Sequence, residues 1–196
     1  MFQFIPKLRD QVSPLIFSKI FNEEEIKNLD QIINSFDYTT GTFFDGSKED
    51  KNTKIRDSKI KWIEPNEDNN WLFKKIEEHV LEANEKQFNF DLYNMPAAIQ
   101  YTEYEGNIKG HYHWHMDLGT GNACYRKLSV TILLSDPSKV EGGNLEFYIG
   151  GRKADICQIN QYDMVVFPSY LLHRVSPVIK GTRKSLVVWL GGSTLK

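Results

Sequence analysis

The stretch His111-Tyr-His-Trp-His-Met-Asp117 holds four potential metal ligands in seven residues, all at odd positions. Side chains on a β-strand alternate between its two faces, so on a strand His111, His113, His115 and Asp117 project to one side. Burying three imidazoles and a carboxylate is costly without partners, and a bound metal ion would supply one. A metal site built on this stretch needs further residues from elsewhere in the chain.

The composition is that of a folded, single-domain protein. The chain has 196 residues, 40% of them hydrophobic, which suffices for one core of ordinary size. Its 24 basic and 26 acidic residues leave a formal charge of -2, which argues against a general binder of nucleic acids or membrane surfaces. We expect one domain over residues 1–196, with no nucleic-acid or membrane partner.

Cysteine usage and hydropathy favour a cytoplasmic location. Only Cys124 and Cys157 are present, outside any paired motif, so two free thiols in a reducing compartment are expected. Charged residues interrupt Met1–Phe17, so we expect no signal peptide there. No apolar run approaches the ~20 residues that span a bilayer. We expect a cytoplasmic protein that is a monomer or a weak homodimer.

Two amphipathic helices are predicted within residues 1–95, which we interpret as a helical support region. Asn22 is a good N-cap ahead of three glutamates, and apolar residues follow at spacings of three and four as far as Phe36. Beyond a break, apolar residues from Leu72 onward mark a second helix that runs to about Phe88. Both patterns are typical of helices packed on a core.

A polar segment between these helices is a candidate flap. Residues 39–61 are rich in Gly, Asp, Ser, Lys and Thr, and we interpret most of them as loop, with a strand near residues 60–63. A loop of this length can cover a site, although an ordinary surface loop has the same composition. We name Arg56 and Trp62 as candidate substrate contacts in and beside this flap.

Beyond Pro96 the chain changes to short β-type runs separated by Gly and Pro turns, a pattern typical of a sandwich or barrel. One run ends with residues 114–117. The other predicted runs are residues 98–104, 129–134, 144–149, 156–159, 164–167, 173–177 and 185–190. There is no internal repeat. The sequence therefore predicts helices first and a β-rich part second.

His173, which opens one of these runs, is a further ligand candidate. Two imidazoles and one carboxylate from His115, Asp117 and His173 can form a facial triad, which leaves three positions open and suits non-haem Fe(II). Zinc on the same ligands remains the chemical alternative. Arg183 and Ser185 share one face of the last predicted strand. A guanidinium there can clamp a carboxylate through two charge-assisted hydrogen bonds, with the hydroxyl adding a third.

The spacing of these residues resembles that of a known family. The pattern His115-x-Asp117, then His173 with Arg183 ten residues later, resembles the Fe(II)/2-oxoglutarate-dependent dioxygenases. The segments that are similar to the prolyl 4-hydroxylase-like branch are Tyr104-Glu-Gly106, Glu141-Gly-Gly-Asn-Leu145, Asp163-Met-Val-Val-Phe-Pro-Ser169, His173-Arg-Val-Ser-Pro-Val178 and Arg183-x-Ser185 leading to Trp189. The resemblance covers roughly residues 98–190. One departure is Arg183 itself, since collagen-type prolyl hydroxylases are expected to carry lysine there.

The resemblance implies an α+β, mainly β fold, a double-stranded β-helix (jelly roll) over residues 96–192 with the N-terminal helices packed on its major sheet. It implies Fe(II) bound by His115, Asp117 and His173, which would be both the metal ligands and the catalytic residues. The same likeness implies 2-oxoglutarate as cosubstrate, bound by Arg183 with help from Tyr104 and Ser185. Dioxygen would be the oxidant, with ascorbate a common reductant of this branch.

The implied reaction is hydroxylation of an amino-acid residue, proline in a peptide or protein, with release of succinate and CO2. Alternatives are a hydroxylase of a free amino acid or other small molecule, and a non-catalytic metal-binding jelly roll. His113 is the rival ligand, because it has the same strand parity as His115; we rank it instead as a neighbour or substrate contact. Arg174 should face away from the site as a surface or packing residue.

Overall fold

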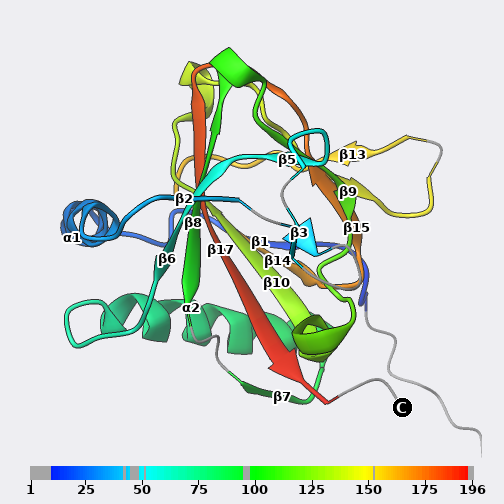
Figure 1. Ribbon diagram of the computed structural model, residues 1–196. Coiled ribbons are helices and arrows are strands. Elements are labelled where there is room, and N and C mark those ends of the chain that lie inside the picture. Colours follow the sequence, from blue (N-terminus) through cyan, green and yellow to red (C-terminus); the bar gives the residue numbers. More distant parts are fainter. Residues whose placement is uncertain are drawn as a thin grey trace, which may run out of the picture.

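Two α-helices and two larger antiparallel sheets make up most of the described chain (Figure 1). The computed structural model describes residues 10–41, 43–44, 49–50, 52–94, 98–151 and 153–193. The helical segments are α1 Glu23–Asn34, α2 Asn70–Ala83, a π-helical turn Asn84–Phe88, and the 3-10 turns Gly106–Ile108, Gly121–Tyr125 and Pro137–Lys139. None of the helices in these ranges has the length and apolar character to cross a membrane. With two α-helices and two larger sheets in the described residues, the protein is mainly β, as the sequence predicts.

The larger sheet has eight strands and carries the helices. In spatial order its strands are β1 Leu15–Phe17, β14 Met164–Pro168, β10 Arg126–Leu133, β17 Thr182–Gly192, β8 Ile99–Glu105, β6 Lys59–Ile63 and β2 Thr39–Thr40, with β7 Leu92–Asn94 also paired to β17. All of these pairs are antiparallel. The eleven residues of β17 lie at its centre.

The smaller sheet has five strands, in the order β13 Asp155–Ile156, β12 Leu145–Tyr148, β15 Leu172–Val175, β9 His111–His115 and β5 Arg56–Asp57. Two further strand pairs join β11 Glu141–Gly142 to β16 Val178–Lys180, and β3 Phe43–Phe44 to β4 Glu49–Asp50. Figure 1 shows β9 and β15 side by side at the right of the molecule. This pairing brings together residues that are some sixty positions apart in the sequence.

Strict alternation along the central strands separates the core from the pocket. Leu186, Val188 and Leu190 of β17 belong to a buried apolar cluster that also takes in α1 and α2. The residues between them, Val187 and Trp189, line a pocket on the opposite face of the sheet. Because side chains on a strand alternate, one strand seals the helical core and also furnishes the pocket wall. A second apolar cluster joins β12 to β14 and so ties the two sheets together.

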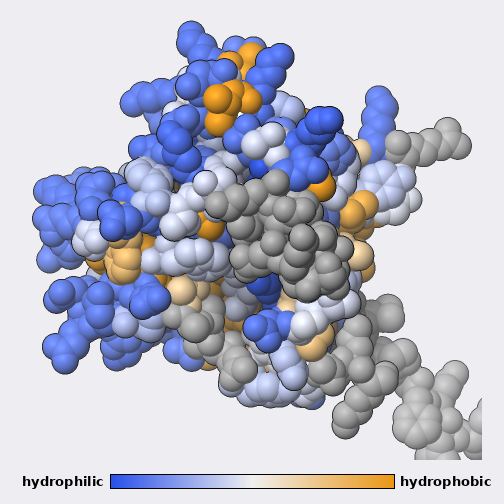
Figure 2. All heavy atoms as spheres, viewed as in Figure 1, coloured by the Kyte–Doolittle hydropathy of each residue, from blue (hydrophilic) through white to orange (hydrophobic). Residues whose placement is uncertain are grey.

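The two predicted helices are present. Asn22 caps α1 through a capping box, in which its side chain accepts from the Glu25 N–H at 2.9 Å and the Glu25 carboxylate accepts from the Asn22 N–H at 2.9 Å. The helix ends at Asn34, so the predicted stripe residue Phe36 lies just beyond it and packs on the core. Around α1 the surface is mostly hydrophilic in Figure 2, as expected of a helix with one buried stripe.

The predicted flap differs in part from expectation where the structure describes it. Residues 42, 45–48 and 51 lie outside the described residues. Arg56–Asp57 forms β5 and pairs with β9, and Lys59–Ile63 forms β6 in the larger sheet. The strand predicted near residues 60–63 is confirmed by β6. Polar composition predicts a loop at Arg56–Asp57, but β9 supplies partners for the backbone hydrogen bonds there. Strands β5 and β6 are therefore part of the two larger sheets, and β5 brings Arg56 beside the pocket.

Candidate metal centre

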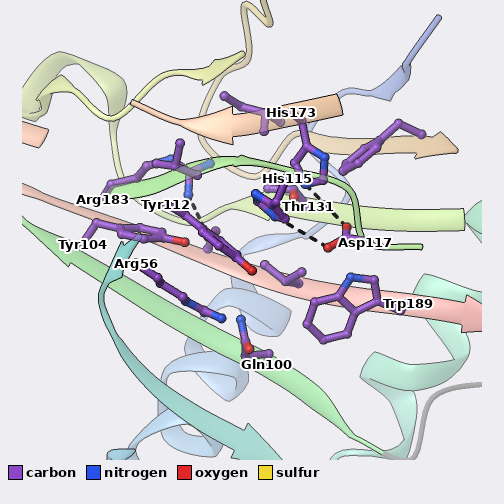
Figure 3. A pocket seen from close by; sticks show the side chains of 15 residues that line it. Arg56, Gln100, Tyr104, Tyr112, His115, Asp117, Thr131, His173, Arg183 and Trp189 are labelled. Atoms are coloured by element: carbon purple, nitrogen blue, oxygen red, sulfur yellow. Dashed lines mark hydrogen bonds and ion pairs between the residues drawn. The ribbon is translucent and has the colours of Figure 1, made fainter. Parts of the chain in front are cut away.

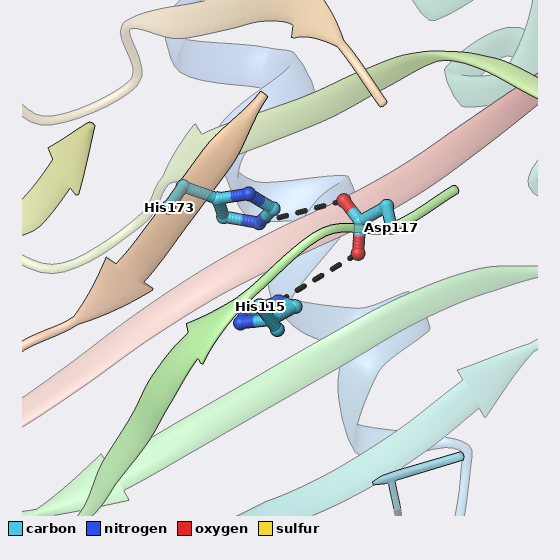
Figure 4. A group of neighbouring side chains, drawn as sticks. All are labelled: His115, Asp117 and His173. Carbon is cyan, nitrogen blue, oxygen red and sulfur yellow. Dashed lines mark ion pairs between the residues drawn. The ribbon is translucent and has the colours of Figure 1, made fainter. Parts of the chain in front are cut away.

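Three side chains form a compact group between the sheets. His115, Asp117 and His173 each offer one ligand atom, and these atoms lie within 4.8 Å of one another (Figure 4). The Asp117 Oδ2 atom is 3.5 Å from Nε2 of His173, and Oδ1 is 3.7 Å from Nε2 of His115. Bonds of about 2.1 Å to one ion place neighbouring ligand atoms about 3 Å apart or slightly more. The group therefore fits a single metal ion.

Both imidazoles present Nε2 to this centre because the main chain engages Nδ1. The Nδ1 atom of His115 is 2.7 Å from the carbonyl oxygen of His113, and Nδ1 of His173 is 2.8 Å from that of Leu171. A carbonyl can only accept, so Nδ1 carries the proton in each ring and Nε2 keeps its lone pair. This is how protein metal sites orient their histidine ligands.

The charge states also suit a metal. Burial, followed by the neighbouring His173, lowers the pKa of His115 to about 3, so its ring is neutral at physiological pH. Burial alone would raise the pKa of the Asp117 carboxyl, yet its electrostatic interactions, the largest with His173 and the next with His115, and a hydrogen bond from Ser129 hold that pKa below its usual value. A neutral imidazole and an ionised carboxylate are the forms that bind metal ions.

Strand β9 departs from the simple alternation that the sequence suggested. Its register with β15 pairs His115 with His173 but Tyr112 with Val175, so β9 contains one extra residue between the two pairs. Because of this bulge, Tyr112 and His115 both line the pocket. Asp117 lies two residues beyond the end of the strand. The predicted single row of ligands on one strand face is therefore wrong, although His115 and Asp117 still meet.

The two remaining histidines of the stretch lie apart from the group. His113 is exposed and does not line the pocket, and its Nδ1 accepts from the Trp114 N–H at 2.9 Å. The two ring nitrogens of His111 lie 3.0 Å and 3.2 Å from the carbonyl oxygens of Lys109 and Lys54. Both rings thus contact main-chain groups, and neither joins the three ligands.

Arg183 lies in the same pocket, as its position on β17 predicted (Figure 3). It is only 3% exposed, and its Nη1 donates to the Ser185 hydroxyl at 2.9 Å. The guanidinium carbon is 5.9 Å from the ring centroid of Tyr104, its cross-strand neighbour on β8. Burial lowers the pKa of the guanidinium. Its Nη2 atom is buried without a hydrogen-bond partner, a costly arrangement that favours a bound anion.

The candidate substrate contacts fall in different places. Arg56 is 7% exposed, lines the pocket, and donates from Nε to the Ser58 hydroxyl at 2.9 Å. Its guanidinium carbon lies 4.8 Å from the ring centroid of Tyr112. Trp62 is 41% exposed and does not line the pocket, but it packs on Trp189, which does, at 6.3 Å between ring centroids.

Sequence reasoning missed several other pocket residues, among them Gln100, Tyr112, Thr131 and Trp189. Gln100 and Thr131 had a usable signal, because each is a polar position alternating with apolar ones on a predicted strand next to β17. Tyr112 had none, because only the bulge turns it inward. Arg174 faces away as predicted and pairs with Glu146 at 2.8 Å.

Comparison with known proteins gives concordant results. Residues 99–191 match the profile of the 2OG-Fe(II) oxygenase superfamily. A PKHD-type hydroxylase of Synechococcus sp. (strain CC9605) is 37% identical over 79 residues, which is 40% of this chain and 36% of that protein. The chain thus spans about a third of the length of that curated relative.

Two solved structures share the fold at low sequence identity. A prolyl hydroxylase from Trichoplax adhaerens, in complex with a hypoxia inducible factor oxygen degradation domain peptide fragment, gives a TM-score of 0.75 at 19% identity, covering 91% of this chain and 83% of that one. A prolyl-4-hydroxylase of Pseudomonas putida gives 0.70 at 17% identity, covering 93% of this chain and 94% of that one. These likenesses concern the fold.

Proposed function

We propose that this chain, whose residues 99–191 match the model of the 2OG-Fe(II) oxygenase superfamily, is an Fe(II)- and 2-oxoglutarate-dependent hydroxylase. The observation that carries the proposal is a juxtaposition. A three-ligand group and a buried guanidinium with an unpartnered N–H line one pocket. The first can hold a metal ion with open positions, and the second needs an anion.

His115, Asp117 and His173 would hold Fe(II) through two Nε2 atoms and one carboxylate oxygen. Two neutral imidazoles and one carboxylate are the donor set of non-haem iron oxygenases, and the Nδ1 hydrogen bonds already orient both rings. With 2-oxoglutarate and dioxygen, an iron ion held by these residues would supply the oxidising power to insert one oxygen atom into a C–H bond, with release of succinate and CO2.

Arg183 would hold the far carboxylate of 2-oxoglutarate. Its Nη2 is available and its Nη1 is already steadied by Ser185, so a carboxylate arriving between the guanidinium and that hydroxyl gains charge-assisted hydrogen bonds. Tyr104 lies across the strand pair and completes this end of the pocket. The enclosing sheets exclude water from the clamp, which strengthens the ion pair.

The two sheets would form the double-stranded β-helix of this superfamily. Pocket residues come from both sheets, and one apolar cluster joins α1 and α2 to the larger sheet. We propose that residues 1–196 act as one domain, in which residues 1–95 support a catalytic core over residues 96–192. Strands β1, β2, β5 and β6, which lie within residues 1–95, pair into the two larger sheets, so the support region and the core are joined in one domain.

Proline in a peptide or protein is the acceptor we propose. The Trichoplax prolyl hydroxylase of the same fold was solved with a peptide, and the related Synechococcus protein is called a hydroxylase. Arg56, which lines the pocket, and Trp62, which packs on a lining residue, would contact the substrate; His113 would meet only parts of it outside the pocket. A free amino acid or other small molecule is the alternative acceptor.

Succinate formation from 2-oxoglutarate tests the proposal. The protein would be incubated with Fe(II), ascorbate and air, with proline-containing peptides in one set and free amino acids in another. Succinate that rises with a peptide and is lost in His173→Ala supports the proposed function. Stimulation by free amino acids alone would replace the acceptor with the alternative. Absence of succinate under every condition would favour a non-catalytic metal-binding protein.

A further inference from the structure

Asp117 lies beyond the end of β9, yet two buried serines fix it in place. The Ser129 hydroxyl donates to Asp117 Oδ2 at 2.7 Å, and the Ser169 hydroxyl is 2.9 Å from the Ser129 hydroxyl. Both serines are fully buried. A ligand outside regular structure would otherwise be free to turn about its side-chain bonds, so these contacts define its orientation.

Main-chain hydrogen bonds of Ser169 also hold the Asp117 segment in place. The Ser169 carbonyl oxygen accepts from the N–H groups of Asp117 and Leu118 at 2.9 Å and 2.8 Å, and its own N–H donates to the Lys127 carbonyl at 2.9 Å. Ser169 follows β14 and lies four residues before His173 in the sequence. One residue thus connects the segments that carry two of the three ligands, and it anchors both to β10.

The single proton on each hydroxyl determines which of the two serines donates the hydrogen bond between them. An ionised carboxylate can only accept, so Ser129 uses its single proton on Asp117. Ser169 must then donate to Ser129, which makes a chain that runs from Ser169 through Ser129 to Asp117. Hydrogen bonds arranged in series polarise one another. The chain occupies a lone pair of Oδ2, which favours Oδ1 as the oxygen that binds an ion.

We propose that Ser129 and Ser169 are positioning residues that orient the Asp117 carboxylate, so that it binds the metal through one oxygen and leaves the remaining positions open. This inference rests on the proposed function, because it assigns the serines a role toward a metal on the three ligands. Without the Ser129 hydroxyl, the carboxylate can turn and chelate the ion with both oxygens, which fills a position that a cosubstrate needs.

Metal binding and coordination test this role directly. The affinity for Mn(II) would be measured by electron paramagnetic resonance of the free ion, and the coordination of Co(II) by its visible absorption. Three variants are compared. Ser129→Ala removes the hydroxyl that bonds Asp117, and Ser129→Thr keeps a hydroxyl at this position. Ser169→Ala removes the hydroxyl but keeps the main-chain carbonyl that accepts from Asp117 and Leu118. Ser176→Ala is the matched control, since Ser176 is also buried and its hydroxyl accepts from the Asn144 N–H at 2.9 Å, outside the pocket.

Ser129→Ala should bind Mn(II) about 10-fold more weakly or worse and change the Co(II) spectrum, as losses of outer hydrogen bonds to metal ligands typically do. Ser169→Ala should shift both readings in the same direction but less, and Ser129→Thr should restore them toward wild type. Wild-type affinity and spectrum in both alanine variants, or equal losses in Ser176→Ala, would overturn the inference. If the wild-type protein binds neither ion, the proposed function fails instead, so the two failures are distinguishable.

Discussion

The phenol ring of Tyr112 lies against the imidazole of His115, with 3.6 Å between the ring centroids and 17° between the ring planes. The guanidinium of Arg56 stacks on the same phenol ring. Tyr112 reaches this position only because β9 is bulged between Tyr112 and His115. A stacked ring restricts rotation of the imidazole, so Tyr112 should hold the ligand in its binding orientation.

Replacing Tyr112 should therefore weaken metal binding without removing a ligand. An aromatic pair contributes about 0.5–1.5 kcal/mol, so Tyr112→Ala should raise the Kd for Mn(II) roughly 2- to 10-fold. Tyr112→Phe keeps the ring and should bind Mn(II) like the wild type. Titration of both variants, with thermal unfolding as a check on folding, decides the matter. Equal Kd values in Tyr112→Ala and wild type would show that the stack has no role in binding.

Gly143 should govern the position of Arg183. Its φ of +64° favours glycine, and a Cβ there would lie 3.1 Å from Cδ of Arg183 and 2.8 Å from a Val178 methyl group. Gly143→Ala should push the guanidinium aside and weaken 2-oxoglutarate binding roughly tenfold, the cost of one charge-assisted hydrogen bond.

Gly150 provides the control for this substitution. Its φ is +71°, and a Cβ there meets nothing within 4 Å. Gly150→Ala carries the same kind of backbone strain but should leave 2-oxoglutarate affinity unchanged. Calorimetric titration of both variants separates strain from displacement of Arg183. A loss of affinity in Gly150→Ala as large as that in Gly143→Ala would remove Arg183 from the explanation.

The neighbouring histidines should behave differently. His113→Ala removes an exposed side chain outside the pocket and should leave metal content and succinate formation near wild type. His115→Ala removes a ligand and should abolish both. Metal analysis after reconstitution with Fe(II) compares the two proteins. If His113→Ala loses its iron while His115→Ala retains it, the ligand assignment is reversed.

Much of the site follows from local sequence patterns. Strand parity places Arg183 beside Ser185, and the structure joins them by a hydrogen bond. The N-cap pattern at Asn22 locates the start of α1. These features depend on residues a few positions apart, where periodicity and capping chemistry act directly.

The missed features depend on distant partners. The bulge that turns Tyr112 inward exists only in the register of β9 with β15, which lies some sixty residues further along the chain. Strand β5 is polar, and only its pairing with β9 makes Arg56–Asp57 a strand. The bond from Ser129 to Asp117 likewise joins two segments whose contact no local pattern specifies.

The capping box should contribute measurably to stability. Asn22→Ala removes the hydrogen bond to the Glu25 N–H and should lower the free energy of unfolding by about 1 kcal/mol. Asn28→Ala, an exposed change inside α1, should stay within about 0.5 kcal/mol of wild type. Urea denaturation gives both values. Equal free energies of unfolding for Asn22→Ala and Asn28→Ala would show that the cap makes no measurable contribution to stability.

The most direct test of a site that combines a metal ion with a carboxylate-binding Arg183 is calorimetric titration of 2-oxoglutarate into the protein. The titration is done with and without Mn(II), which would occupy the metal site without being oxidised. We expect one 2-oxoglutarate to bind per chain, with an affinity that requires the metal and is strongly weakened in Arg183→Ala. Binding that is equally tight in metal-free protein, or that is unchanged in Arg183→Ala, would contradict this expectation.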